Sequence, residues 1–236
     1  GVYLQREYHR YYPAGEVASN VLGFTNIDDS GQEGLELAYN DWLRGEAGRK
    51  MVIKDRLGRT IKHVESIKAA QPGKNLALSI DRRLQYLTYR ELKRAVKKYK
   101  AKSASAVILD TKTGEVLAMV NQPSYNPNNR KNLKSNNFRN RAVTDIFEPG
   151  STIKPFTMAA ALESGNYRPI TKIDTSPGTL RVGTNTIRDH RNYGIIDLTR
   201  IIQKSSNVGM SKIALSIPAS QITRMHNNVG FGVSSH

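Results

Sequence analysis

The sequence contains no cysteine among its 236 residues. Disulfide bonds and thiol chemistry are therefore excluded, and no cysteine-based zinc spacing is present. No apolar run approaches the roughly 18–20 residues that a membrane-spanning helix needs. No signal peptide is visible, and the first residue is Gly1 rather than Met, which is typical of a cut or processed end. The length fits one large domain or two small ones with a real core.

Acidic residues are scarce: 20 stand against 36 lysines and arginines, which gives a formal net charge of +16. Such a charge favours an anionic partner such as nucleic acid, an acidic membrane surface or another polyanion. The basic residues are spread along the chain, with one dense cluster at Lys97 to Lys102. No nucleic-acid motif accompanies them, so a nucleic-acid binder rests on charge alone and no such partner is expected. A basic surface facing anionic lipid is a sufficient interpretation.

The segment from Phe147 to Phe156 places Ser151 three residues before Lys154, at the start of an expected helix. The alanine-rich stretch from Thr157 to Glu163 favours helix, and Gly165 ends it. Residues three apart on a helix share a face, so a hydroxyl and an amine would point into one pocket near a helix N-terminus. That pattern is what a serine nucleophile with a nearby base requires. On these residues alone, a capping serine followed by a solvated lysine is the favoured interpretation, because that arrangement is far commoner in proteins.

The same segment closely resembles the active-site segment of the penicillin-binding proteins, which are serine D,D-transpeptidases. Three further stretches, Tyr12 to Glu16, Gly31 to Glu36 and Lys54 to Arg59, resemble the non-catalytic module of the class B members. Among these, they are most similar to the cell-division type, often called penicillin-binding protein 3. The resemblance extends over nearly the whole chain.

The second motif of this family is assigned to Ser205 and Asn207, with Ser206 between them where the β-lactamase version has Asp. The pattern Ser-x-Asn is not specific, because it also begins at Ser124, Ser135 and Ser164. The Ser205 copy alone lies between two expected helices, Ile195 to Lys204 and Val208 to Ser216, in a stretch similar to the family's.

The third motif, Lys-Thr-Gly, occurs only at 112–114, which precedes Ser151 and lies at the expected turn of a hairpin. This copy is therefore not assigned to the site. No Lys-Thr-Gly or Lys-Ser-Gly follows Asn207. We accordingly expect the chain to be a fragment of a longer enzyme, with little activity by itself.

The resemblance implies a mechanism and a setting. Ser151 would attack the penultimate D-alanine of a peptidoglycan stem peptide, Lys154 would accept its proton, and Ser205 would relay a proton to the leaving group. Asn207 would hydrogen-bond the substrate amide or Lys154. β-Lactams would acylate Ser151. The reaction would cross-link stem peptides during septal cell-wall synthesis, at the periplasmic face of the bacterial inner membrane.

The resemblance also implies partners. These are cell-division membrane proteins, including a glycosyltransferase, and the family's N-terminal membrane anchor is absent from this sequence. Neither the residues nor the resemblance implies a cofactor or a metal. Three alternatives stay open: a β-lactam sensor, a non-catalytic division scaffold, and a hydrolase using the adjacent Asp189 and His190, for which no Gly-x-Ser-x-Gly is present.

The expected fold is α+β. An irregular non-catalytic module occupies residues 1–73, and residues 74–236 form part of a transpeptidase domain with helices packed on an antiparallel sheet. The expected elements are a helix at 35–43 with Trp42 on its buried side, a hairpin at 51–64, a strand at 75–80, a helix at 82–99 capped by Asp81, two strands at 104–110 and 115–121, and short strands at 179–182 and 184–188.

Overall fold

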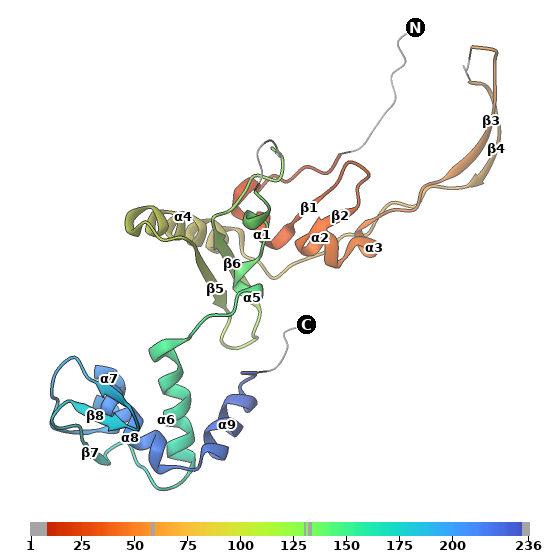
Figure 1. Ribbon diagram of the computed structural model, residues 1–236. Coiled ribbons are helices and arrows are strands. Elements are labelled where there is room, and N and C mark those ends of the chain that lie inside the picture. The colour runs from red at the N-terminus through yellow and green to blue at the C-terminus, as the bar shows by residue number, and fades with distance from the viewer. Residues whose placement is uncertain (1–8, 58–59, 130, 132–133, 233–236) are drawn as a thin grey trace. The chain divides into compact units, whose positions relative to one another are not determined.

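The computed structural model describes residues 9–57, 60–129, 131 and 134–232 (Figure 1). The chain divides into two compact units, Gly1–Asp145 and Ile146–His236. The described strands pair in five two-stranded sheets, all antiparallel, and helices accompany them in both units. The expected α+β class is confirmed.

The first unit opens with short elements. They are η1 (Gly15–Val17), α1 (Ser19–Leu22), β1 (Phe24–Thr25), β2 (Gly31–Glu33), α2 (Gly34–Ala38) and α3 (Asn40–Leu43). Aromatic rings hold them to a distant part of the same unit, since Phe24, Tyr125 and Phe138 make edge-to-face pairs with centroids 5.0–5.8 Å apart. The hydroxyl of Tyr12 accepts a hydrogen bond from the Thr25 amide at 2.9 Å. Aromatic packing with satisfied hydroxyls therefore organises this irregular region.

The expected helix at 35–43 is wrong in two respects. The helix breaks at Tyr39, and the Asn40 side chain accepts a hydrogen bond from the Gly31 amide at 2.9 Å. Asparagine favours such local bonds over a helix interior. Trp42 is 46% exposed rather than buried. Its indole donates to the Asn75 carbonyl at 3.0 Å, and the Lys74 ammonium lies 4.2 Å from its ring centroid, so polar contacts hold the ring at the surface.

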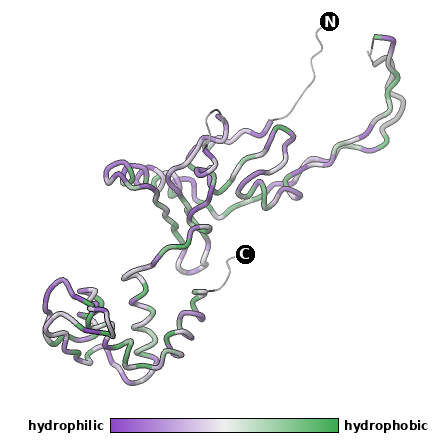
Figure 2. The backbone as a smooth tube through the Cα atoms, viewed as in Figure 1, coloured by the Kyte–Doolittle hydropathy of each residue, from purple (hydrophilic) through white to green (hydrophobic). Residues whose placement is uncertain are grey.

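A long hairpin follows, formed by β3 (Arg49–Lys54) and β4 (Thr60–Lys68), which confirms the hairpin expected at 51–64. It extends as an arm in Figure 1, and its expected turn at Gly58 lies outside the described residues. Hydrophobic and hydrophilic residues are mixed along the arm in Figure 2, and Met51 and Ile53 are half exposed.

The expected strand at 75–80 is not a strand in the structure, which gives this stretch no element. Two contacts connect its end to β6 (Val116–Gln122): the Ser79 hydroxyl donates to the Val116 carbonyl at 2.8 Å, and the Asp81 amide donates to the Leu117 carbonyl at 2.9 Å. An alternating pattern predicts an extended backbone here, but a strand also needs a continuous ladder of partners.

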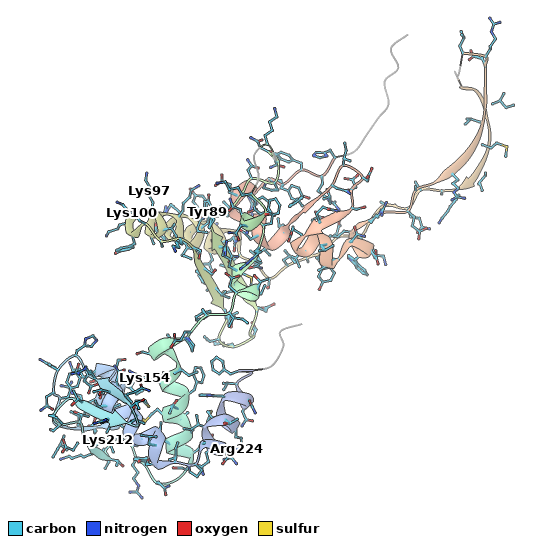
Figure 3. All side chains as sticks on the ribbon, viewed as in Figure 1. Tyr89, Lys97, Lys100, Lys154, Lys212 and Arg224 are labelled. Atoms are coloured by element: carbon cyan, nitrogen blue, oxygen red, sulfur yellow. The ribbon has the colours of Figure 1, made fainter. Side chains whose placement is uncertain are left out.

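The expected helix at 82–99 is confirmed as α4 (Arg82–Tyr99), and Asp81 caps it by accepting from the Arg83 and Leu84 amides at 2.8 and 2.9 Å. Helix α4 packs on β6 and β5 (Ala104–Leu109). The buried Gln85 fixes this packing, because its side-chain amide both donates to the Met119 carbonyl and accepts from the Met119 amide, each at 2.9 Å. The lysine-rich end of α4 points away from the sheet in Figure 3, where Lys97 and Lys100 are labelled.

The Lys-Thr-Gly sequence at 112–114 forms the tight turn between β5 and β6. The Asp110 carboxylate accepts from the amides of Lys112 and Thr113 at 2.7 and 3.1 Å, and Gly114 has a φ of 77°. Asx-type bonding and a left-handed glycine are ordinary turn chemistry. The hairpin turn predicted for this Lys-Thr-Gly sequence is confirmed.

Two short elements complete the first unit, η2 (Ser135–Asn137) and α5 (Arg141–Thr144). The second unit contains η3 (Gly150–Ile153), α6 (Lys154–Glu163), β7 (Lys172–Asp174), β8 (Thr179–Val182), β9 (Asn185–Arg188), β10 (Ile195–Asp197), α7 (Leu198–Lys204), α8 (Asn207–Ser216) and α9 (Ala219–Asn228). The helix expected from Ile195 begins at Leu198 instead, because residues 195–197 pair with β7 and Asp197 caps α7 by accepting from the Arg200 amide. Helix α9 was not expected.

Apolar side chains from α6, α7 and α8 form the core of the second unit. Its buried members are Met158, Ala160, Ala161, Leu198, Ile201, Met210, Ile213 and Ile217. Small residues on α6 allow the neighbouring helices to approach closely. The core thereby fixes the start of α6 against the junction between α7 and α8.

Within the described part of the chain, no helix has the length and apolar character needed to cross a membrane.

A polar cluster joins η1 to α4 in the first unit and yields a first prediction. The Lys93 amine donates to the Glu16 carboxylate at 2.8 Å and to the buried Tyr89 hydroxyl at 2.7 Å, and Tyr89 also bonds Glu16. The bonds from Lys93 and Tyr89 lower the pKa of Glu16. A lowered pKa means that the ionised carboxylate stabilises the fold above its unfolded pKa and that this contribution is lost as the pH falls through the folded value.

Glu16→Gln should therefore cost about 0.5–1 kcal/mol at pH 7, since the pair is partly exposed, and the cost should shrink below about pH 4. Urea unfolding followed by the fluorescence of Trp42, the single tryptophan, reports on this unit. Asp28→Asn, which removes an exposed charge elsewhere in the unit, is the control. Equal effects of the two substitutions, or a cost that persists at pH 3, would contradict the prediction.

Candidate active site

Ser151 and Lys154 lie on consecutive elements of one short segment. Ser151 is in the 3₁₀ turn η3, and Lys154 is the first residue of α6, whose first turn also accommodates Pro155. The Lys154 amide donates to the Ser151 carbonyl. The α-helix therefore begins at Lys154, after Ser151, but a 3₁₀ turn has three residues per turn and still places the two residues on one side.

The Lys154 side chain reaches the junction between α7 and α8. Its amine lies 2.7 Å from the Ser205 carbonyl oxygen, 3.1 Å from the Ser205 hydroxyl and 2.6 Å from the Asn207 side-chain oxygen. Lys154 is labelled in Figure 3. An ammonium group has three N–H donors, and these three acceptors engage all of them. The structure thus brings together three of the four predicted site residues, Lys154, Ser205 and Asn207.

The backbone at Ser205 is what places its two oxygens on one amine. Ser205 follows the last residue of α7 and has a left-handed backbone with a φ of 50°. This conformation is uncommon for a residue other than glycine. It ends α7 and turns the chain so that α8 begins at once, with Ser206 as its N-cap.

Asn207 is held so that its side-chain oxygen faces Lys154. Its side-chain nitrogen donates to the Arg188 carbonyl at 2.8 Å, and its backbone amide donates to the Asp189 carboxylate at 2.5 Å. The orientation of an asparagine amide is set by such partners. With the nitrogen committed to β9, the oxygen is the atom that meets the lysine.

The environment of Lys154 shifts its protonation equilibrium toward the neutral form. Partial burial of the amine lowers the pKa of Lys154, and the negative charge of Asp189 opposes that shift. Burial penalises the charged form of a lysine, whereas a nearby anion favours it. Because the net effect is a lowered pKa, this lysine is suited to accept a proton.

The hydroxyl of Ser151 is exposed, and among the described residues it makes no hydrogen bond to the Lys154 amine. Nucleophile–base bonds are often long in structures without substrate. The structure therefore places Ser151 one turn from Lys154 and free to approach it.

Two residues that the sequence interpretation did not assign to the site support it. The Asp189 carboxylate accepts from the Ser206 hydroxyl at 2.7 Å and from the amides of Asn207 and Val208 at 2.5 and 3.1 Å. Ser206 is 1% exposed and also accepts from the Gly209 amide at 2.9 Å. The available signal was the preference of serine for N-caps. The distance in sequence between Asp189 and α8 left no comparable signal for the aspartate.

The hydrolase alternative based on Asp189 and His190 gains no geometric support. Both carboxylate oxygens of Asp189 face the start of α8, and the His190 side chain is exposed. In the part of the chain that the structure describes, no group of three or more histidine, aspartate or glutamate side chains is arranged to hold a metal ion.

Comparison with models of known protein families shows which family the chain belongs to. The family model for the penicillin binding protein transpeptidase domain matches residues 104–236, and the model for the penicillin-binding protein dimerisation domain matches residues 1–78. The chain belongs to the penicillin-binding protein transpeptidase family, and the predicted membership is confirmed.

Individual relatives agree with this assignment. The chain is 47% identical over its whole length to peptidoglycan D,D-transpeptidase FtsI of Escherichia coli strain K12, and 43% identical over 99% of its length to probable peptidoglycan D,D-transpeptidase PenA of Neisseria gonorrhoeae. It spans about 40% of the length of each.

Among solved structures, penicillin binding protein 3 of Mycobacterium tuberculosis matches 94% of this chain and 47% of its own, with a TM-score of 0.79 and 30% identity. That protein has also been solved in complex with aztreonam and with ampicillin.

The close packing at the start of α8 yields a second prediction. A Cβ atom on Gly209 would lie 2.8 Å from two side-chain atoms of the buried Ile201 and 3.1 Å from the Ser206 hydroxyl. Gly209→Ala should destabilise this unit by about 1–3 kcal/mol through overpacking. At an open helix position the same change would instead stabilise by about 1 kcal/mol.

Hydrogen exchange of the α7 and α8 amides measures this effect within the unit. Ser211→Ala, on the same helix, is the matched control and should slow exchange or leave it unchanged. Slower exchange in Gly209→Ala would show that the contact with Ile201 relaxes without cost.

Proposed function

We propose that this chain forms part of a serine D,D-transpeptidase that cross-links peptidoglycan stem peptides, with Ser151 as nucleophile and Lys154 as base. In this proposal residues 1–73 belong to the non-catalytic module and residues 74–236 to the transpeptidase domain. The chemistry is acyl transfer from a D-Ala-D-Ala terminus. Membership of the family and the names of the relatives support this substrate class.

The observation that carries the proposal is the set of acceptors around Lys154. The Ser205 carbonyl and the Asn207 side-chain oxygen can only accept hydrogen bonds. A neutral amine has two N–H groups and one lone pair, and these two acceptors use both N–H groups. The lone pair then faces the third partner, the Ser205 hydroxyl, which can reverse and donate. The site thus accommodates a neutral lysine, and a proton can pass between Lys154 and Ser205.

The reaction follows from this arrangement. The Lys154 amine turns its lone pair from the Ser205 hydroxyl to the Ser151 hydroxyl and takes the Ser151 proton as the Ser151 oxygen attacks the carbonyl carbon of the penultimate D-alanine. The bond to the terminal D-alanine breaks, and its nitrogen takes a proton through the Ser205 hydroxyl. An amine of a neighbouring stem peptide then attacks the ester, and its proton returns by the same route to the Ser151 oxygen. Asn207 hydrogen-bonds Lys154 and the substrate amide and so keeps both in position for the reaction.

No Lys-Thr-Gly follows Asn207 in this sequence. The contact to the substrate carboxylate and part of the oxyanion hole therefore have no assigned residue here. Loss of one oxyanion donor typically costs about 10²–10³ in rate. We accordingly expect slow acylation by this chain alone.

The proposed setting is septal wall synthesis at the periplasmic face of the inner membrane, with an anchor outside this sequence and with division membrane proteins, including a glycosyltransferase, as partners. The similarity to FtsI supports it. β-Lactams would form the same ester with Ser151, in line with the complexes of the Mycobacterium tuberculosis protein.

A third prediction tests the nucleophile directly. Prolonged incubation with excess benzylpenicillin should add one penicilloyl mass to this chain, with the adduct on the peptide containing Ser151, and none to Ser151→Ala. Intact and peptide mass spectrometry measure this. Ser220→Ala, an exposed serine on α9 of the same unit, is the control and should keep the adduct.

A chimaera that continues the chain after His236 with the corresponding sequence of the Escherichia coli relative, of which this chain spans about 40%, provides a second arm, because the family resemblance implies that the third motif follows. Faster acylation of Ser151 in the chimaera is expected. An adduct on a different residue, or none in either protein, would overturn the proposal. An adduct without turnover of a stem peptide by the chimaera would favour the sensor alternative.

A fourth prediction concerns pH. Burial lowers the pKa of Lys154, and the neutral amine is the form that acts as base. The acylation rate should therefore rise with pH to a plateau, and the midpoint of this rise should lie below pH 10.5. Rates measured from pH 6 to pH 11 with a chromogenic cephalosporin give the midpoint. Lys154→Arg keeps its charge over this range and should not acylate at any of these pH values. A midpoint at 10.5 or above would contradict the assigned base.

A further inference from the structure

The start of α8 is capped by a residue from outside the helix. Asp189 directly follows β9, and its carboxylate receives the amides of Asn207 and Val208, two of the first N–H groups of α8 that have no partner within the helix. A carboxylate at this end also complements the helix dipole, and charge-assisted bonds are the stronger kind. The carboxylate therefore attaches the first turn of α8 to the end of β9.

Ser206 makes the attachment two-sided. Its hydroxyl donates to the second oxygen of Asp189 at 2.7 Å and accepts from the Gly209 amide at 2.9 Å. The side chain is almost fully buried, so these bonds are shielded from water. Asp189 and Ser206 together make four hydrogen bonds at the first turn of α8 and so hold it in place.

The attachment controls Asn207, which is the residue that meets Lys154. Its backbone amide is fixed by Asp189, its side-chain nitrogen by the Arg188 carbonyl, and its side-chain oxygen lies 2.6 Å from the Lys154 amine. If the first turn of α8 moved from β9, the contact with Arg188 would be lost and the amide would be free to rotate. A reversed amide would present N–H groups to an amine that also donates, so the contact with Lys154 would fail.

We propose that Asp189 is the positioning residue of this site: its carboxylate holds the first turn of α8 against β9 and so keeps the Asn207 oxygen on the Lys154 amine. The residue need not touch substrate. Its charge has a second effect, because it raises the pKa of Lys154 against the lowering by burial. The other charged or titratable groups on the elements that meet there are Arg188 on β9, His190 after it, Arg200 and Lys204 on α7, and Lys212 on α8.

Two variants of the whole chain separate geometry from charge. Asp189→Ala removes both accepting oxygens and the charge, whereas Asp189→Asn removes the charge and one accepting oxygen and keeps one oxygen that can still receive the Asn207 and Val208 amides. Asp197→Ala is the matched control, because Asp197 caps α7 in the same unit by accepting from the Arg200 amide at 2.7 Å and makes no contact with Lys154. It should loosen the first turn of α7 and leave Lys154 unchanged.

Two readouts need no acylation. Hydrogen exchange of the Asn207 and Val208 amides should accelerate about tenfold or more in Asp189→Ala, less in Asp189→Asn, and not in Asp197→Ala. NMR titration of ¹³C-labelled lysine, with the Lys154 signal assigned from Lys154→Arg, should show a lower Lys154 pKa in both Asp189 variants. A purely structural aspartate would change overall stability, as is expected for Asp197, without changing this titration.

The third readout rests on the proposed function. Acylation of Ser151 by benzylpenicillin at its high-pH plateau should fall about 10–100-fold in Asp189→Ala and less in Asp189→Asn. Unchanged exchange and an unchanged Lys154 titration in both variants, or changes equal to those of Asp197→Ala, would overturn the positioning role. If no protein acylates, the proposed function fails, while exchange and titration still decide the role of Asp189.

Discussion

The left-handed backbone of Ser205 is the constraint on which the site depends. It ends α7 two residues before α8 begins and turns a carbonyl and a hydroxyl of the same residue toward the Lys154 amine. A left-handed residue other than glycine costs roughly 1–2 kcal/mol, so the surrounding bonds must hold it in place. The Ser206 amide, bonded to the Ile201 carbonyl at 2.9 Å, and the Asp189 carboxylate do so from the two sides of the junction.

Packing in the core brings the lysine to that junction. Ala160 and Ala161 on α6 are buried against Ile201 and Ile213, and such small side chains leave little space between the helices. Lys154 is the first residue of α6, so the position of this helix fixes where the amine can reach. The packing of the helices in the apolar core therefore sets how far the Lys154 amine can reach, and the turn at Ser205 sets which oxygens face it.

The sequence predicted what local chemistry determines. Asp81 capping α4 and the hairpin turn after Asp110 were correct because caps and turns depend on neighbours in the chain. The predictions were wrong where a residue distant in the sequence determines the local structure. Trp42 stays at the surface through Asn75 and Lys74, and residues 75–80 lack a continuous strand partner. The bond between Asp189 and α8, across 18 residues, has no local pattern that would reveal it.

The identity of the hydrogen-bond partners, rather than lysine itself, distinguishes Lys154, the proposed base, from Lys93, a structural cation. Lys93 bonds a carboxylate and a phenol, and these bonds raise its pKa. Lys154 bonds a carbonyl, a hydroxyl and an amide oxygen, all neutral, and burial lowers its pKa. An anion in contact would have favoured the charged form of Lys154, whereas neutral acceptors orient the amine without offsetting its desolvation. The Asp189 carboxylate hydrogen-bonds α8 rather than the Lys154 amine. It therefore holds the first turn of α8 in place, while its charge only partly opposes the lowering of the Lys154 pKa by burial.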